Sequence, residues 1–561
     1  MLSLDKINTV DHHIKKQLIC RGCENHCTIT RFEFENGNIF YGGNKCERVF
    51  SSKGNNIEKG YNLFRYKSEL LFGSASTKRA DFDTLTIGIP RILNMFENFP
   101  FWNTLFSECG INVVLSSPST TALYEKGLGT VMSDNICFPA KLVHGHIFDL
   151  AEKKVDRIFM PMVFKEKQVV PSHNSFNCPI VTGYTEVVKS AINPRKRWGI
   201  TVDGPTVTFK DEVLLKKACK EYITSLRPHE IKVSESQFNR AFSKAIASMQ
   251  EFKAKLKVKA DEIIANSLAE NKQLMVLAGR PYHVDNLINQ KTAEILTELG
   301  TNVICEDVLP AVTGGDEDFY LSQWGYPARI TNAAKWVASQ PANVRLVQLN
   351  SFGCGPDAII TDEVKEILQT TGKNNNLIRV DEITSTGSIR LRLRSVVEFA
   401  KYSNEEVLQR SEKPRKRNKP FMPEDKGRTI IAPLFSDIYS RLFPPFFKLA
   451  GYKLVNLPVT DTIALGEGLR YTNNEICYPA ITVIGDVIKA LKSGNYERGS
   501  VAVGITQTGG QCRASNYLAL IKKAMVNAGF TDVPIISVST ASGLHEQPGF
   551  NMPWAKIIRK F

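Results

Sequence analysis

The sequence lacks a long apolar run, and this absence sets the first limits on the protein. No stretch approaches the ~20 consecutive apolar residues that a membrane-spanning helix requires. Residues 1–17 are polar and charged, without the apolar core of a secretory signal peptide. We therefore expect a cytoplasmic protein without a membrane partner, in a compartment that keeps thiols reduced.

A concentrated basic patch is also missing, although basic residues outnumber acidic ones. The 71 Lys and Arg against 57 Asp and Glu leave a net charge of +14, which raises nucleic acid as a partner. The basic residues are dispersed, and their densest run, at 413–419, lies among prolines and polar residues typical of an exposed linker. This dispersal argues against nucleic-acid binding. A basic surface equally suits an acidic protein or the phosphates of a nucleotide or of coenzyme A.

What the sequence does contain is an alternation of strand and helix patterns, which predicts an α/β fold. Its 561 residues exceed one ordinary hydrophobic core. Short apolar strands followed by helices that end at glycine predict Rossmann-like units with parallel sheets. The expected segments are a cysteine-rich β-hairpin module at 1–80, a first α/β unit at 81–200, a bridging helical segment at 201–270, a second α/β unit at 271–405, a basic linker at 406–428 and a third α/β unit at 429–561.

The three α/β units share the order strand, helix, glycine, strand. The expected strand pairs are 87–90 with 111–116, 274–279 with 301–305, and 429–433 with 452–457. Between the first two units, residues 236–268 contain neither Gly nor Pro. Ser234 and Gln237 form a capping-box pattern just before this stretch, which therefore predicts one long helix.

Two cysteine-centred sequences recur in different units. The matching pairs are DNICFPA (134–140) with NEICYPA (474–480), and NSFGCGP (350–356) with QTGGQCR (507–513). The first pair also shares a glycine six residues after its proline, at Gly145 and Gly485. Self-similarity centred on cysteine is hard to explain by packing alone.

Four cysteines near the N-terminus predict a metal site. They are Cys20, Cys23, Cys27 and Cys46. Between the third and the fourth, Asn36-Gly37 is a strong hairpin signal, and a hairpin there carries Cys46 back toward Cys27. Four converging thiolates fit a tetrahedral zinc site or a four-iron cluster, and the spacing leaves both open.

Five further cysteines follow expected strands, at the sheet edge where open α/β sheets bind ligands. They are Cys137, Cys178, Cys354, Cys477 and Cys512. Three of them stand just before a proline suited to the first turn of a helix, where free N–H groups and the helix dipole favour a thiolate. The other two lie in glycine-containing turns that can donate N–H groups to sulfur. We expect the five to bind iron–sulfur clusters, and Cys109 and Cys219, inside helical patterns, to be core residues.

At these residues the sequence resembles the C-terminal portion of the activase-related proteins of the 2-hydroxyacyl-CoA dehydratase system. It is more distantly similar to the dehydratase subunits and to double-cubane cluster proteins. Besides the N-terminal cysteines, the matching stretches are GIPR (88–91), SDNICFPAKLVHGH (133–146), GRPYH (279–283), SFGCGPD (351–357) and QTGGQCRASNY (507–517). The likeness extends over nearly the whole chain.

The resemblance implies 4Fe-4S clusters and low-potential, anaerobic electron transfer coupled to an ATP-hydrolysing activator protein. It assigns Cys137, Cys178 and Cys354 to one cluster, with one iron left without a protein ligand. Cys477 and Cys512 would hold a second cluster or complete a linked double cubane, whose sixth thiolate would come from Cys305 or the N-terminal module. The sequence shows neither a P-loop nor the actin-like ATPase region of the large family members, so the ATPase is a separate chain or the protein is an independent reductase component.

Three functions therefore stay open at this point. The first is a redox or reductase component that passes electrons from an ATP-driven partner to a small or CoA-linked substrate. The second is a 2-hydroxyacyl-CoA dehydratase subunit, for which His144, His146 and His283 are the nearest candidates for a general base. The third is a non-enzymatic scaffold with one zinc ion at the N-terminal module.

Overall fold

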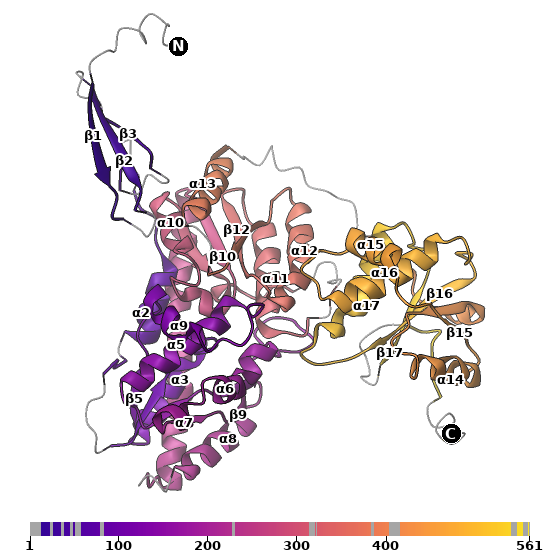
Figure 1. Ribbon diagram of the computed structural model, residues 1–561, viewed down its shortest axis with the longest axis horizontal. Coiled ribbons are helices and arrows are strands. Elements are labelled where there is room, and N and C mark those ends of the chain that lie inside the picture. Colours follow the sequence, from indigo (N-terminus) through magenta and orange to yellow (C-terminus); the bar gives the residue numbers. More distant parts are fainter. Residues whose placement is uncertain are drawn as a thin grey trace, which may run out of the picture.

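The structure is a computed structural model in which three α/β units follow one another, with a small antiparallel sheet projecting from them (Figure 1). It describes residues 13–22, 26–34, 39–44, 49–50, 58–73, 75–78, 84–226, 231–313, 320, 322–382, 386–402, 416–539, 547–553 and 559. The fold class predicted from the sequence is confirmed, because the units contain parallel sheets and the N-terminal sheet is antiparallel. Within the described residues no helix is both long and apolar enough to span a bilayer.

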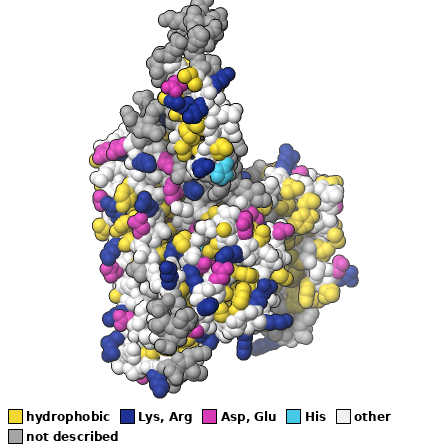
Figure 2. Space-filling model, turned by 60° about the vertical axis from the view of Figure 1, so that its left-hand side comes forward, with side chains coloured by type: hydrophobic (Ala, Val, Ile, Leu, Met, Phe, Trp, Pro, Cys, Tyr) yellow, Lys and Arg dark blue, Asp and Glu magenta, His cyan; other side chains and the backbone are white. Residues whose placement is uncertain are grey.

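The N-terminal sheet consists of β1 (His13–Ile19), β2 (Thr28–Phe34) and β3 (Ile39–Gly42), in that spatial order. β2 and β3 pair antiparallel, with Phe32 opposite Phe40, as the predicted hairpin requires. The Asn36-Gly37 turn itself lies outside the described residues. Figure 2 shows hydrophobic side chains exposed on this sheet, and Lys and Arg side chains scattered over the visible face of the molecule.

The first unit has a four-stranded parallel sheet in the order β5-β4-β6-β8. Its elements are β4 (Thr86–Ile89), α3 (Met95–Glu108), β5 (Asn112–Leu115), α4 (Thr121–Leu128), α5 (Phe138–Glu152), β6 (Arg157–Phe159), β7 (Met162–Lys165), α6 (Pro179–Ala191), α7 (Pro194–Trp198), β8 (Thr201–Asp203), β9 (Thr206–Thr208) and α8 (Glu212–Ser225). β7 and β9 form a separate parallel pair. The fourth strand of the main sheet thus comes from residues 201–203.

The segment predicted as one long helix is α9 (Glu235–Ala269), and the Ser234 side chain accepts the Gln237 N–H at its start. α9 packs along α3 and also contacts α2 (Leu63–Phe72), which precedes the first unit. The buried side chains of α9 recur at helical spacing, from Phe238 to Ile263. α9 therefore belongs to the hydrophobic core that the first two units share.

The second and third units repeat the strand order of the first, as β11-β10-β12-β13 and β15-β14-β16-β17. The second unit contains β10 (Leu274–Ala278), η2 (Pro281–Val284), α10 (Thr292–Glu298), β11 (Asn302–Cys305), η3 (Glu306–Val308), α11 (Gly325–Ala338), β12 (Val344–Ser351), α12 (Gly355–Gln369), β13 (Asn376–Val380) and α13 (Thr386–Tyr402). The third contains η4 (Pro423–Gly427), β14 (Thr429–Ala432), η5 (Ser440–Leu442), α14 (Phe443–Leu449), β15 (Lys453–Asn456), α15 (Thr462–Tyr471), α16 (Tyr478–Lys492), β16 (Val501–Gln507), η6 (Arg513–Asn516), α17 (Tyr517–Asn527) and β17 (Ile535–Ser539).

In all three sheets the chain runs from a central strand to one edge and then returns to the other side of that central strand. This reversal creates a topological switch point at the carboxyl ends of the strands, where α/β sheets bind ligands. The third unit has its own cores on the two faces of its sheet, and one of them includes Phe176 and Trp324 from the first two units. The units therefore meet through packed side chains close to their switch points.

Candidate functional site

Each of the five cysteines predicted as cluster ligands is the N-cap residue of a helix. Cys137 precedes α5, Cys178 precedes α6, Cys354 precedes α12, Cys477 precedes α16 and Cys512 precedes η6. In the four α-helices a proline occupies one of the first two positions, where its missing N–H costs no hydrogen bond. At the fifth, the Ala514 N–H lies 3.5 Å from the Cys512 sulfur. The sequence thus sets each sulfur at a helix end that favours negative charge.

The structure brings three of these sulfurs together, from two different units. Burial raises the pKa of Cys137 to about 12, and the nearby Cys178 thiol adds to the increase. Burial likewise holds the pKa of Cys354 well above its usual range, with further contributions from Asp357, Cys137 and Cys178. Since such coupling acts over short distances, the three thiols form one group, and Cys137 and Cys354 would resist losing their protons without a positive charge nearby.

That positive charge comes from Arg280, at the carboxyl end of β10. Its Nη2 lies 3.4 Å from the Cys354 sulfur and donates to Asp357 Oδ1 at 2.6 Å. The side chains of Arg280 and Asp357 are almost fully buried, and their ion pair raises the pKa of Arg280 well above its usual range despite burial. The guanidinium also partly offsets the raised pKa of Cys354. In the sequence, this arginine stands out only as part of the GRPYH stretch. Its position directly after an expected strand is the feature that could have identified it as a site residue.

His283 holds the loop that carries Arg280. Its Nδ1 accepts the Arg280 backbone N–H at 2.8 Å, and its Nε2 lies 3.3 Å from Ser351 Oγ. Burial first, and then the Arg280 charge, lower the pKa of His283 to about 3, so the ring is neutral. The geometry gives this histidine a positioning role.

The other two histidines considered as general bases are also buried and hydrogen-bonded at both nitrogens. His144 bonds Thr130 Oγ1 at 2.7 Å and Tyr184 Oη at 2.9 Å. His146 bonds Ser116 Oγ at 2.8 Å, and its other nitrogen lies 3.1 Å from Ser119 Oγ. Burial lowers their pKa values to about 4 and about 3. Neither ring is placed to take a proton from a substrate without giving up a bond that it already makes.

Cys477 and Cys512 form a second group around Tyr517. The Cys477 sulfur lies 3.1 Å from Tyr517 Oη. Burial raises the pKa of Tyr517, and the bond to Cys477 and the charges of both thiols raise it further, against the effect of Arg513. The tyrosine hydroxyl is thus protonated and able to donate to a thiolate at Cys477.

The two groups meet where the third unit contacts the first two. A Cβ added to Gly355, the residue after Cys354, would lie 2.5 Å from Arg513 Cδ, so the Arg513 side chain packs directly against this residue. Trp324 Nε1 donates to the Gln511 carbonyl oxygen at 3.0 Å. Gln511 Nε2 in turn donates to Thr182 Oγ1 at 2.6 Å, one turn beyond Cys178 on α6. The turn that carries Cys512 therefore touches the helices that begin at Cys178 and Cys354.

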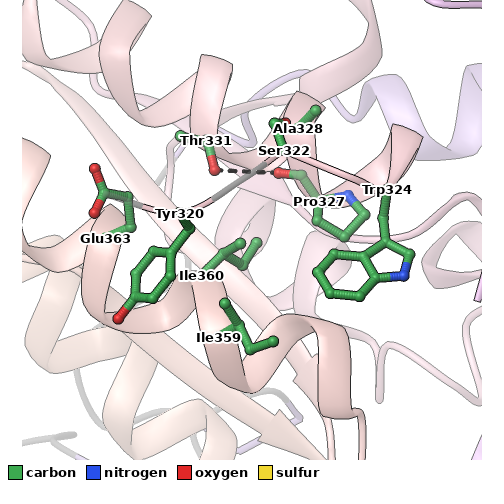
Figure 3. A pocket seen from close by; sticks show the side chains of 9 residues that line it. All are labelled: Tyr320, Ser322, Trp324, Pro327, Ala328, Thr331, Ile359, Ile360 and Glu363. Atoms are coloured by element: carbon green, nitrogen blue, oxygen red, sulfur yellow. Dashed lines mark hydrogen bonds between the residues drawn. The ribbon is translucent and has the colours of Figure 1, made fainter. Parts of the chain in front are cut away.

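A small pocket of about 320 Å³, counting the space open to solvent, adjoins this junction between α11 and α12. In Figure 3 the rings of Tyr320 and Trp324 flank the pocket, with Ile360 between them. The Thr331 hydroxyl donates to the Pro327 carbonyl oxygen at 3.2 Å. The pocket therefore lies beside the helix that starts at Cys354.

Of the N-terminal cysteines, the structure describes Cys20 and Cys27, whereas Cys23 and Cys46 lie outside the described residues. The Cys20 N–H donates to the Cys27 carbonyl oxygen at 2.9 Å. A Cβ on Gly22 would lie 2.3 Å from Val49 Cγ2, so the chain returns against this loop shortly after Cys46. The predicted four-cysteine site stays a prediction.

The three cysteines left over lie in the core of the first two units. Cys109 and Cys219 are buried as expected, and burial raises the pKa of Cys109 to about 11. Cys305 is buried beside Asp307 and Lys67, and burial places its pKa well above the usual range. Within the part of the chain that the structure describes, no three His, Cys, Asp or Glu side chains are arranged around a position for a single metal ion.

Residues 86–309 match the family model described as the CoA enzyme activase uncharacterised domain (DUF2229). This segment is therefore similar to a domain of CoA enzyme activases. The match confirms the resemblance predicted from the sequence, and the activase-related domain contains Cys137, Cys178 and Arg280, whereas Cys354 lies beyond its end. The chain matches none of the curated proteins. A solved structure, the C-terminal domain of glucosamine-fructose-6-phosphate aminotransferase from Francisella tularensis, aligns at 10% identity over 62% of this chain and 96% of that chain, with a TM-score of 0.19.

Proposed function

We propose that the protein is an iron–sulfur redox component that accepts electrons from an ATP-hydrolysing activator protein and passes them to a small or CoA-linked substrate. The observation that carries the proposal is the group of Cys137, Cys178 and Cys354 around Arg280 at the carboxyl edges of two sheets. The activase-related domain supports a connection with CoA enzymes.

The donor set suits an iron–sulfur cluster for an electrostatic reason. Burial and the neighbouring thiols raise the pKa of Cys137 and of Cys354, so these two side chains stay protonated when free. A bound cluster would replace those protons and would supply the positive charge that thiolates at Cys137, Cys178 and Cys354 need. A cluster held by Cys137, Cys178 and Cys354 would supply one-electron chemistry at low potential, and these three ligands would leave one iron without a protein ligand.

The remaining residues of the site have roles that follow from their contacts. Arg280 donates to the sulfur of Cys354 and keeps a positive charge in a buried site, while Asp357 fixes its orientation. Neutral His283 positions the Arg280 backbone. We propose that Cys477 and Cys512, with Tyr517 donating to sulfur, bind a second cluster or part of a linked pair. Cys305 is buried beside Asp307, so it is poorly placed to supply the sixth thiolate of a linked pair of clusters.

The test is metal and sulfide analysis of protein purified without oxygen, together with electron paramagnetic resonance. We expect brown protein with several irons per chain. Cys354→Ala should lose the iron of one cluster, whereas Cys219→Ala, a buried core cysteine, should keep it all. Iron-free, colourless protein would refute the proposal, and one zinc without iron would favour the scaffold alternative.

A further inference from the structure

The third unit contains an apolar cavity on the face of its sheet that α14 covers. The cavity encloses about 620 Å³, counting the space open to solvent, and it is larger than the pocket at the junction. It is lined by Ala432, Phe435, Phe443, Phe446, Phe447, Leu454, Gly504, Ile505, Thr506, Val538 and Met552. None of the described residues in this lining carries a charge.

Small residues on the sheet and a short helix create the space. Ala432 ends β14, and Gly504 lies in the middle of β16, where a Cβ would come within 2.7 Å of Ile430 Cγ2. Above them α14 has only 7 residues and contributes phenylalanine rings as walls. The corresponding helix of the first unit, α3, has 14 residues, and most of its side chains are buried. The cavity thus results from a covering helix that is half as long.

The loop that joins two lining residues of the cavity is apolar as well. The loop between the lining residues Phe435 and Phe443 exposes Ile438 and Tyr439, which keep 74% and 67% of their surface accessible. Ser440 holds this loop from inside, since its hydroxyl accepts the Phe435 N–H at 3.0 Å. Exposed apolar side chains around an apolar cavity are characteristic of ligand sites rather than of a sheet surface facing water.

We propose that this cavity binds the uncharged hydrocarbon tail of a small amphipathic molecule. The uncharged lining excludes a phosphate or carboxylate from the interior, since such a group would lose its hydration without gaining a partner. The cavity lies over the carboxyl-terminal halves of β14 and β16, and the exposed Thr506 stands at its edge. β16 continues, after Gln507, into the turn that carries Cys512. The polar end of such a ligand therefore emerges at the sheet edge that presents this cysteine.

The test is calorimetric titration with unbranched alcohols from butanol to decanol, and with benzyl alcohol as an aromatic probe. We expect saturable 1:1 binding whose affinity rises about fourfold per added methylene until the cavity is full, and then levels off. If benzyl alcohol binds more tightly than hexanol, the tail is aromatic; the reverse order indicates an aliphatic tail. The proposal needs no bound metal, so it stands or falls independently of the iron content.

Two variants locate the binding. Ala432→Leu fills the cavity floor and should weaken hexanol binding by about tenfold. Val459→Leu is the control: it adds a methylene at an exposed position of the same unit and should leave the affinity for hexanol unchanged. Phe443→Ala widens the wall and should move the plateau to longer alcohols. Affinity that never levels off, or that both cavity variants leave unchanged, would overturn the proposal and assign the binding to the exposed loop.

Discussion

The first and third units are built on the same plan, yet they differ in how their sheets are covered. In both, a short helix follows the edge strand, α4 or α15, and the cysteine expected at the strand end, Cys137 or Cys477, instead caps the next helix, which leads back. In both, a second cysteine follows the next strand and caps a helix, at Cys178 and Cys512. The placement of the thiols thus follows from topology, whereas the cavity of the third unit follows from the length of one covering helix.

The repeated glycines show that part of the internal similarity records packing. A Cβ on Gly145 would lie 2.1 Å from the Leu123 carbonyl oxygen, and one on Gly485 would lie 1.8 Å from that of Ala464. In each unit, the helix that begins after the cysteine therefore packs backbone to backbone against the preceding helix. The echoing sequences combine a cysteine that caps a helix with a glycine that lets two helices pack closely.

The largest expected effect comes from breaking a buried ion pair that anchors the first unit to the second. Glu97 on α3 accepts two hydrogen bonds from Arg329 on α11, at 2.7 and 2.9 Å, and both side chains are nearly inaccessible. Arg329→Met leaves a buried carboxylate without this partner and should lower the free energy of unfolding by about 3–5 kcal/mol. Urea unfolding followed by circular dichroism measures the loss.

The same ion pair predicts how stability depends on pH. Despite the opposing effect of burial, Arg329 and Lys253 hold the pKa of Glu97 far below its usual range. The stabilisation is therefore complete above the pKa of an unfolded glutamate, about 4.3, and is lost as the pH falls below it. The wild type should lose more stability than Arg329→Met between pH 5 and pH 3, and equal slopes would contradict this account.

The second prediction compares the thiols of the two units in metal-free protein. Cys137 has a pKa of about 12, whereas Cys512 is exposed to solvent. At pH 8 iodoacetamide should therefore alkylate Cys512 on the order of a hundredfold faster. Raising the pH should accelerate labelling of Cys137, because its thiolate fraction grows. Peptide mass spectrometry follows both sites, and equal rates at pH 8 would refute the raised pKa of Cys137.

The third prediction concerns the paired glycines. Gly145→Ala and Gly485→Ala should each reduce the free energy of unfolding by about 2 kcal/mol or more, because the new methyl group meets a backbone carbonyl. Gly466→Ala on α15 is the control, since a Cβ there meets nothing within 4 Å. That control should be neutral or stabilise by about 0.5–1 kcal/mol. A neutral Gly485→Ala would show that the third unit packs differently from the first.

The smallest effect is expected for a surface ion pair of the third unit. Lys492 Nζ lies 2.6 Å from Glu467 Oε2, and both side chains remain partly exposed. Lys492→Met should change the free energy of unfolding by less than about 1 kcal/mol. Comparison with Arg329→Met under the same conditions shows how much burial contributes to the loss of unfolding free energy in that variant.

Local patterns in the sequence predicted much of the fold. The strand expected at 274–279 is β10, and the helix expected at 236–268 is α9 with its Ser234 cap. The helix that the strand, helix, glycine, strand order predicts in the first unit is α3, which runs from Met95 to Glu108. These successes share one cause: apolar periodicity, caps and glycine stops act over a few residues.

The sequence by itself determined where each of the five cysteines sits, because a proline or a glycine turn beside it defines the start of a helix. Only the tertiary structure decided which sulfurs meet. Arg280 reaches Cys354 across 74 positions of sequence, and Arg513 lies against Gly355 through contact between units. Such meetings depend on how whole sheets pack, and no pattern within a few residues encodes them. The same holds for the cavity, which exists because a short helix covers a sheet of small residues.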